Sequence, residues 1–178
     1  MGRLAGMKFL LPLALFAAAW LTSSPATGET AGLARIDHVA DGDTVTLTSG
    51  YRVRFVQIDT PEVYFTPECY GRQASALTKR LLPPGTIVRL IAEPATDKVD
   101  RYGRLLRYVI RARDGLDVNL YLVRVGAAAP YFYEGRRGRY AAEILRLARR
   151  ARFLHLGLWG RRPRTPWNPD RGVATGSA

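Results

Sequence analysis

Short runs of apolar residues alternate with polar positions between residues 31 and 111, and each run ends at a turn signal. Runs of this kind that are rich in Val, Ile and Leu are typical of strands. We expect five strands, at residues 31–40, 44–47, 52–58, 87–91 and 105–111. Ser49 and Gly50 form a hairpin turn between the second and third of them. Pro61 stops the third strand, so residues 59–68 are expected to form a loop.

Three stretches have the spacing of a helix instead. After Asp117, apolar residues recur at i, i+3, i+4 and i+7, and Gly126 follows the last of them. Asp is a favoured N-cap residue, and Gly is favoured just beyond a helix end. We therefore expect helices at residues 72–82, 118–125 and 139–154.

Strands interrupted by helices indicate an α+β fold rather than a parallel doubly wound sheet. A five-stranded OB-fold β-barrel with three helices is the natural candidate, and such barrels often bind oligonucleotides. We expect this domain to span residues 27–160. Residues 161–178 are rich in Arg, Pro, Gly and Ser and lack periodicity, which predicts a disordered basic C-terminal tail.

The first residues have the pattern of an export signal. Arg3 and Lys8 precede an apolar run at residues 9–21, and small residues follow up to Ala26. This predicts a signal peptide at residues 1–26 and a secreted or periplasmic protein. The apolar run is short for a membrane span, which needs about 20 residues, so a retained N-terminal membrane anchor is the second interpretation.

The charge balance points to a polyanionic partner. The chain has 27 Lys and Arg residues against 15 Asp and Glu residues, for a net charge of +12. Such a surface attracts nucleic acid, anionic lipid or acidic glycans. Cys69 is the only cysteine, so no disulfide forms within the chain and the core must supply the stability.

The candidate chemistry lies between Asp41 and Glu62. Three carboxylates, Asp43, Asp59 and Glu62, stand near strand ends, with Arg54 between them in the sequence. Clustered carboxylates repel one another unless a cation is bound. Hard oxygen donors favour Ca²⁺ or Mg²⁺. Taken alone, Asp41 and its neighbours are most often only a turn.

Two arginines extend this hypothesis to a phosphate. Arg54 lies on the strand that leads into the carboxylates, and Arg104 stands just before another strand. A guanidinium presents a planar fork that suits two phosphate oxygens. Two guanidiniums and a cation around one phosphate would stabilise the charge of a phosphoryl-transfer transition state, and Glu62 could orient or deprotonate the attacking water. The simpler interpretation of either arginine is a solvated surface charge.

The ordered set of motifs resembles the staphylococcal (micrococcal) nuclease, or thermonuclease, family. Each motif is weak by itself, but the set follows the order and spacing of the family over residues 34–160. The matching segments are residues 41–44 (DGDT), 54–62 (RFVQIDTPE), 70–75 (YGRQAS), 100–104 (DRYGR), 118–119 (VN) and 131–133 (YFY).

The resemblance implies an OB-fold barrel with three helices that cleaves DNA and RNA with Ca²⁺ as cofactor and leaves 3′-phosphate ends. Asp43 and Asp59 are the implied direct Ca²⁺ ligands, together with the backbone carbonyl of Thr60. Glu62 is the implied residue that contacts the metal through water and acts on the nucleophile. Asp41 is left as a turn-former.

The same resemblance assigns the substrate contacts. Arg54 and Arg104 are the implied phosphate clamp. The implied nucleotide-binding residues are Arg101, Tyr102, Tyr131 and Tyr133. The loop at residues 63–69 is shorter than in the best-known member of the family.

Three functions remain after this comparison of motifs. The first is a secreted, Ca²⁺-dependent endonuclease, acting as a monomer on DNA and RNA. The second is an OB-fold module that binds nucleic acid without cleaving it, which three carboxylates beside a phosphate disfavour because they repel it. The third is a structural Ca²⁺-binding surface protein, which Arg54 and Arg104 disfavour.

Overall fold

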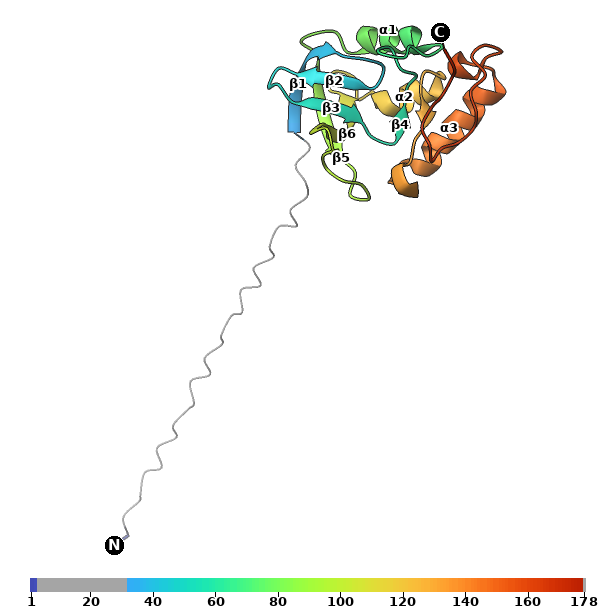
Figure 1. Ribbon diagram of the computed structural model, residues 1–178. Helices are drawn as coiled ribbons and strands as arrows, with labels where there is room; N and C mark the ends of the chain where they lie inside the picture. Colours follow the sequence, from blue (N-terminus) through green and yellow to red (C-terminus); the bar gives the residue numbers. More distant parts are fainter. Residues whose placement is uncertain (3–31, 178) are drawn as a thin grey trace.

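The computed structural model describes residues 1–2 and 32–177. From residue 3 onward, the expected signal segment therefore lies outside the described residues. Within the described part, no helix is both long enough and apolar enough to span a bilayer. The barrel and the helices form one body, with the barrel strands on one side and α3 on the other (Figure 1).

Five strands close into a barrel in the order β1-β2-β3-β6-β5. They are β1 (Gly32–Val39), β2 (Thr44–Leu47), β3 (Arg52–Phe55), β5 (Ile87–Ala92) and β6 (Leu105–Arg111). The pairing of β3 with β6 is parallel, and the other pairings are antiparallel. Val45, Val53, Val88 and Val109 are fully buried in the core. The expected five-stranded α+β barrel is thus confirmed.

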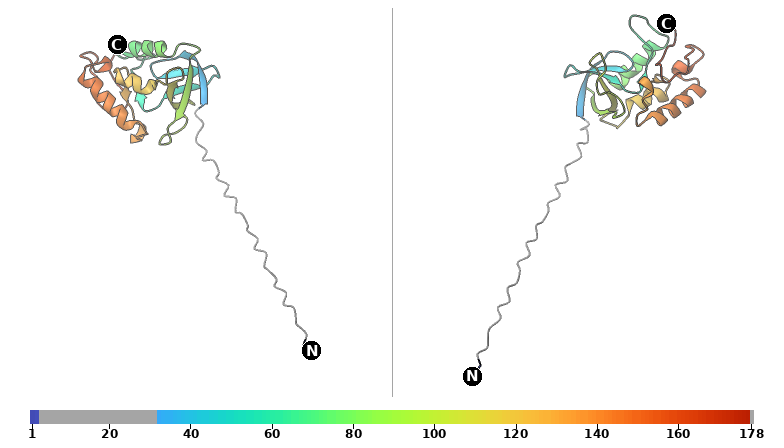
Figure 2. Two further views of the ribbon diagram at one scale, coloured as in Figure 1. Left: turned by 180° about the vertical axis from the view of Figure 1, so that it is seen from behind. Right: turned by 60° about the horizontal axis from the view of Figure 1, so that its bottom comes forward.

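Three helices complete the fold: α1 (Gly71–Leu81), α2 (Val118–Arg124) and α3 (Ala141–Phe153). The side chain of Asp117 accepts a hydrogen bond from the backbone N–H of Leu120 at 3.0 Å, as expected of an N-cap. Gly126 ends this helix with a φ of +73°, which glycine adopts without strain. The helix α2 contacts both β6 and α3, so it lies between the barrel and α3 (Figure 2).

The third expected strand, residues 52–58, is wrong as a continuous element. It is broken into β3 and a short β4 (Ile58–Asp59), because Gln57 has a φ of +64° and turns the chain. After this turn, β4 leaves the barrel and pairs with β7 (Ala129–Pro130). The break places Asp59 outside the barrel, beside the segment that leads to Tyr131 and Tyr133.

The remaining short elements are two 3₁₀ turns, Tyr133–Gly135 and Gly157–Trp159. The first of them begins at Tyr133, directly after Tyr131 and Phe132. Glu134 within that turn has a φ of +52°, so the turn is kinked there.

Residues 161–177 do not form the expected free tail. Trp167 packs against Trp159, with ring centroids 5.6 Å apart, and belongs to the partly buried residues around the core. The backbone N–H of Phe132 donates to the carbonyl of Pro169 at 2.6 Å, and Thr175 is buried. Aromatic packing and backbone hydrogen bonds thus hold this segment against the domain. Its sequence lacks the regular spacing of apolar residues by which an ordered segment is usually recognised.

Candidate active site

The guanidinium of Arg54 is the centre of the site. Its Nε lies 3.0 Å from Oδ1 of Asp43, and its Nη2 donates to Oδ1 of Asp59. Its Nη1 donates to the carbonyls of Phe55 and Ile58, both at 2.7 Å. Described residues thus accept three hydrogen bonds from its two Nη atoms, Nε is in an ion pair, and the side chain is only 11% exposed. Arg54 therefore joins the two carboxylates and braces the bend between β3 and β4.

Asp43 lies just before β2, and both of its carboxylate oxygens have contacts with other residues. Its Oδ2 accepts from the backbone N–H and the hydroxyl of Thr60, at 2.8 and 2.9 Å. Its Oδ1 accepts from Thr44 Oγ1 at 3.2 Å and is also in the ion pair with Arg54. The close approach of Thr60 needs Gly42, because a Cβ at that position would lie 2.5 Å from the Thr60 hydroxyl oxygen.

Asp41 has the turn-forming role that its sequence context suggests. Its Oδ1 accepts from the backbone N–H of Asp43 at 3.1 Å, so it shapes the turn that presents Asp43. Burial and repulsion by Asp43 raise the pKa of Asp41 to about 6.

Asp59 ends β4 and faces the same cavity. Burial raises its pKa to about 7; the charge of Arg54 opposes this rise and that of Asp43 adds to it. Its Oδ2 accepts from the backbone N–H of Val173 at 2.7 Å, a contact between residues far apart in the chain. Each oxygen of Asp59 therefore has one described partner.

Glu62 and Arg104 stand at the mouth of this cavity. The side chain of Glu62 is largely exposed, but its carboxyl is partly desolvated beside the cavity; this desolvation and repulsion by Asp43 raise the pKa of Glu62. Nε of Arg104 lies 2.7 Å from Oδ2 of Asp100, and its Nη1 lies 3.5 Å from the hydroxyl of Thr44. Unlike Arg54, Arg104 keeps most of its N–H groups available to a ligand.

The expected metal and catalytic residues line one polar cavity of about 160 Å³. Its lining consists of Asp41, Asp43, Arg54, Asp59, Thr60, Pro61, Glu62 and Arg104. Four carboxylates there face two guanidiniums, so a cation would relieve the excess negative charge, and the donors are the hard oxygens that Ca²⁺ or Mg²⁺ prefers. Among the described residues, no three His, Cys, Asp or Glu side chains gather closely enough to hold a metal ion by themselves. A bound cation would therefore need backbone carbonyls or water as further ligands beside the carboxylates.

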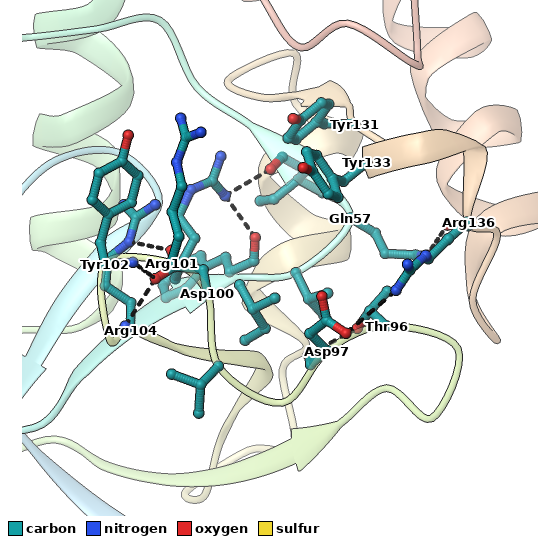
Figure 3. A pocket seen from close by; sticks show the side chains of 16 residues that line it. Gln57, Thr96, Asp97, Asp100, Arg101, Tyr102, Arg104, Tyr131, Tyr133 and Arg136 are labelled. Carbon is teal, nitrogen blue, oxygen red and sulfur yellow. Dashed lines mark hydrogen bonds and ion pairs between the residues drawn. The ribbon is translucent and has the colours of Figure 1, made fainter.

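A second cavity of about 290 Å³ adjoins the first (Figure 3). Arg54 and Arg104 line both cavities, so a ligand group between them can reach each. The expected nucleotide-binding residues all line the second one: Arg101, Tyr102, Tyr131 and Tyr133.

Two tyrosines that line the second cavity, Tyr102 and Tyr133, are largely exposed. Arg101 lies over the ring of Tyr102 at 4.9 Å, and Arg104 does so at 5.4 Å. Tyr131 and Tyr133 make an edge contact with centroids 6.4 Å apart. Tyr102 and Tyr133 are 58% and 56% exposed, so neither is a core residue.

The sequence interpretation missed Gln57 as part of the site. Its Nε2 donates to the carbonyl of Arg136 at 3.0 Å, and its own carbonyl accepts from the backbone N–H of Tyr131 at 3.0 Å. Its Oε1 lies 3.2 Å from the hydroxyl of Tyr108. A lone amide inside an apolar run was the signal that could have revealed it. Val173 carries no comparable signal.

Known proteins resemble this chain over the same region. Residues 52–161 match the family described as Staphylococcal nuclease homologue, a span from β3 to just past the second 3₁₀ turn. The chain is 39% identical over 119 residues to Endonuclease YhcR of Bacillus subtilis (strain 168), which covers 60% of this chain and 9% of that protein. It is 33% identical over 166 residues to a protein named "Uncharacterized endonuclease" from Escherichia coli O157:H7, and equally to one from Escherichia coli.

The two kinds of relative differ in how much of them this chain spans. It covers less than a tenth of the Bacillus protein, but 96% of each Escherichia coli protein and 90% of its own length in those alignments. The family match covers more than half of the chain and includes Arg54, Asp59, Glu62 and Arg104. On this evidence and that of the barrel, the chain belongs to the staphylococcal nuclease family.

Proposed function

We propose that this protein is a Ca²⁺-dependent endonuclease that hydrolyses phosphodiester bonds of DNA and RNA and leaves 3′-phosphate ends. The observation that carries the proposal is the shared cavity wall, in which Arg54 and Arg104 separate a carboxylate-lined cavity from a tyrosine-lined one. A nucleic acid offers a phosphate for the arginines and a base for the tyrosine rings. The two cavities that would receive these groups share Arg54 and Arg104. Family membership and the printed names of the relatives support the same activity.

Asp43, Asp59 and the carbonyl of Thr60 are the proposed Ca²⁺ ligands. When bound, Ca²⁺ would supply positive charge beside the phosphate, where negative charge increases during the reaction. Of the two carboxylates, Asp59 has the greater free acceptor capacity, because Asp43 already accepts four contacts.

The arginines stabilise the charge that develops on the phosphate oxygens. Arg104 is partly exposed and can direct N–H groups into the cavity, whereas Arg54 is held mainly by its own carboxylates and carbonyls. Arg104 is thus the main proposed phosphate donor, and Arg54 has less donor capacity left for the same phosphate. Preorganised donors of this kind are worth most where water is excluded.

Glu62 orients the attacking water and accepts a proton from it. The water oxygen forms a bond to phosphorus while the P–O bond on the 5′ side breaks, and the leaving 5′ oxygen takes up a proton from solvent. The products are a 3′-phosphate and a 5′-hydroxyl. The position of Glu62 at the open mouth of the cavity suits this role, because water reaches it freely.

The substrate strand is proposed to lie across the second cavity. Tyr102, Tyr131 and Tyr133 offer faces and edges to a base, and Arg101 supplies charge to a neighbouring phosphate. Stacking accepts every base, since each has a π-face, which suits an enzyme that cleaves both DNA and RNA. We propose that the protein acts as a monomer and is secreted or periplasmic, or membrane-anchored if its N-terminal segment is retained.

Digestion of plasmid DNA and of RNA tests this proposal. Wild-type protein should cut both with Ca²⁺ and stop when a chelator is added, and end-group analysis should find 3′-phosphates. Parallel reactions with Mg²⁺ and Mn²⁺ identify the metal. Glu62→Gln is the matched control, because this exposed change should abolish cutting while binding to an oligonucleotide persists. Tight binding of nucleic acid by wild-type protein without any chelator-sensitive cleavage would instead identify a non-catalytic binding module.

A further inference from the structure

We propose that the last part of the chain, residues 167–177, is a component of the active site. We call it the C-terminal strap. Its Val173 N–H positions the carboxylate of Asp59 for the cation. The inference rests on the cation site of the proposed function, and it assigns a role to a segment that follows the family match at residues 52–161.

The contact is a short hydrogen bond to one of the two carboxylate oxygens of Asp59. The backbone N–H of Val173 donates to Oδ2 of Asp59 at 2.7 Å, while Arg54 donates to Oδ1. The two donors fix the plane of the carboxylate from opposite ends. A carboxylate has about four lone-pair sites, so Asp59 keeps acceptor capacity for a cation. Without the strap, only Arg54 among the residues that the structure describes would donate a hydrogen bond to this group.

Gly172 is the residue that lets the strap approach so closely. A Cβ on Gly172 would lie 2.7 Å from Oδ2 of Asp59 and 3.7 Å from Cδ2 of Tyr131. Gly172 also has a φ of +76°, a conformation that residues with a side chain rarely adopt. Both features make glycine necessary where the strap passes Asp59.

The strap is anchored on both sides of this contact. Before it, Asp170 pairs with Arg137 at 2.9 Å, and the carbonyl of Pro169 accepts from Phe132. After it, the backbone N–H of Cys69 donates to Gly176 at 2.9 Å. The red C-terminal trace accordingly runs from the region of α3 toward α1 (Figure 1).

These anchors join the strap to the two segments that border the site. Phe132 lies between Tyr131 and Tyr133, and Cys69 lies between Glu62 and α1. The strap therefore spans from the base-binding side to the nucleophile side, with Asp59 between them. Hydrogen-bond partners of metal ligands typically change metal affinity 10- to 100-fold when they are removed. The strap contact is of this kind.

Gly172→Ala and Gly115→Ala form a matched pair for the test. Gly115 lies outside the strap, just after β6. Its φ is +71°, so alanine strains the backbone there as it does at Gly172, but nothing lies within 4 Å of its added Cβ. Calcium affinity is measured by calorimetry on the whole protein, with Asp59→Asn as the reference for a lost site. Gly172→Ala should bind Ca²⁺ about tenfold more weakly. Gly115→Ala should stay within about twofold of wild type.

A kinetic measurement separates positioning from general damage. Gly172→Ala should need about tenfold more Ca²⁺ for half-maximal activity, yet keep the wild-type KM for DNA at saturating Ca²⁺. If Gly172→Ala does not fold, a chain ending at residue 171 replaces it, because that chain retains Trp167, Pro169 and Asp170 as anchors. The same loss of Ca²⁺ affinity is expected.

The possible failures have different signatures. If wild type binds Ca²⁺ and Gly172→Ala binds it equally well or more tightly, the positioning role of the C-terminal strap is overturned and the cation site stands. If wild-type protein binds no more Ca²⁺ than Asp59→Asn, the proposed cation site itself is wrong, and the inference is overturned with it.

Discussion

Arg54 and Asp59 form an ion pair that the chain encloses within a single bend. Nη2 of Arg54 donates to Oδ1 of Asp59, while its Nη1 donates to the carbonyl of Ile58, the residue just before Asp59. The same guanidinium also contacts Asp43. Arg54 is thus part of the framework of the site, whereas Arg104 is a side chain at its mouth. We therefore expect replacement of Arg54 and replacement of Arg104 to have different effects on stability and activity.

Arg54→Ala should reduce both activity and stability. It leaves Asp43 and Asp59 facing each other in a cavity without their shared counter-charge, and breaking a buried pair in this way costs about 3–5 kcal/mol. Urea denaturation at pH 7 measures this loss, and plasmid cleavage measures the activity. Arg54→Lys is the control: it keeps the charge but cannot reach four acceptors, so it should recover part of the stability and little of the activity. A fully stable Arg54→Ala would show that the ion pair contributes nothing to folding.

Arg104→Ala should reduce turnover much more than stability. Its contact with Asp100 is partly exposed, and such pairs contribute about 0–1 kcal/mol. Loss of a donor to the transition state costs about 10²- to 10³-fold in kcat. Turnover under saturating Ca²⁺ and a thermal melt together measure the split. Comparable losses in both would count against a catalytic role for Arg104.

The parts of this structure that sequence reasoning predicted are those in which local chemistry decides the result. The helix after Asp117 is an example, since its N-cap contact and the left-handed Gly126 are both specified within the segment itself. The five strands follow from short apolar runs in the same way. The grouping of Asp43 and Asp59 was accessible for a similar reason, because Asp43 precedes β2 and Asp59 follows shortly after β3, and these two strands pair as a hairpin.

The parts that it missed depend on contacts across the fold. Nothing near Val173 indicates a hydrogen bond to Asp59, and the composition of residues 161–178 argues for disorder. Gln57 breaks a strand because its amide meets Arg136 and Tyr108, neither of which lies near it in the chain. Such long-range hydrogen bonds override the local preference of an apolar run for extended structure.

Gln57→Leu should weaken substrate binding without a matching loss of turnover. The change removes the donor to the Arg136 carbonyl and loosens the segment that carries Tyr131 and Tyr133. We expect KM for a short oligonucleotide to rise about three- to tenfold, in line with about 1 kcal/mol for a lost hydrogen bond, with kcat within about twofold. Glu134→Gln is the control, since Glu134 forms an exposed ion pair with Arg136 but does not line the second cavity, and its replacement should leave KM near wild type. An unchanged KM in Gln57→Leu would show that the amide does not hold this segment.

The buried carboxylate of Glu93 should make stability depend on pH. Glu93 is 4% exposed and accepts from the backbone N–H groups of Ala95 and Arg139, at 3.0 and 2.8 Å, and from the hydroxyl of Tyr108 at 3.1 Å. Burial alone would raise the pKa of Glu93, but these hydrogen bonds and the charge of Arg139 together lower it below the ordinary value of 4.5. The ionised form is therefore favoured in the folded protein.

The sign of the effect follows from this lowered pKa. Because the unfolded chain binds the proton more readily, the contribution of Glu93 is complete above about pH 4.5 and is lost as the pH falls through the folded pKa. We expect the free energy of unfolding, measured by urea denaturation, to fall as the pH is lowered from 5 toward 3. Glu93→Gln should lose about 2–4 kcal/mol at pH 7, because an amide cannot accept every contact and places N–H groups against donors.

The variant should also show a smaller loss of stability on acidification than wild type, because the proton uptake of Glu93 is gone. Some pH dependence should remain, since hydrogen bonds also lower the pKa of Asp100 against the opposing effect of burial. Glu134→Gln is the matched control, because Glu134 is exposed and its replacement should leave both the stability at pH 7 and the pH slope as in wild type. Parallel curves for wild type and Glu93→Gln from pH 7 to pH 3 would show that Glu93 is protonated equally in both states, which its four contacts with donors argue against.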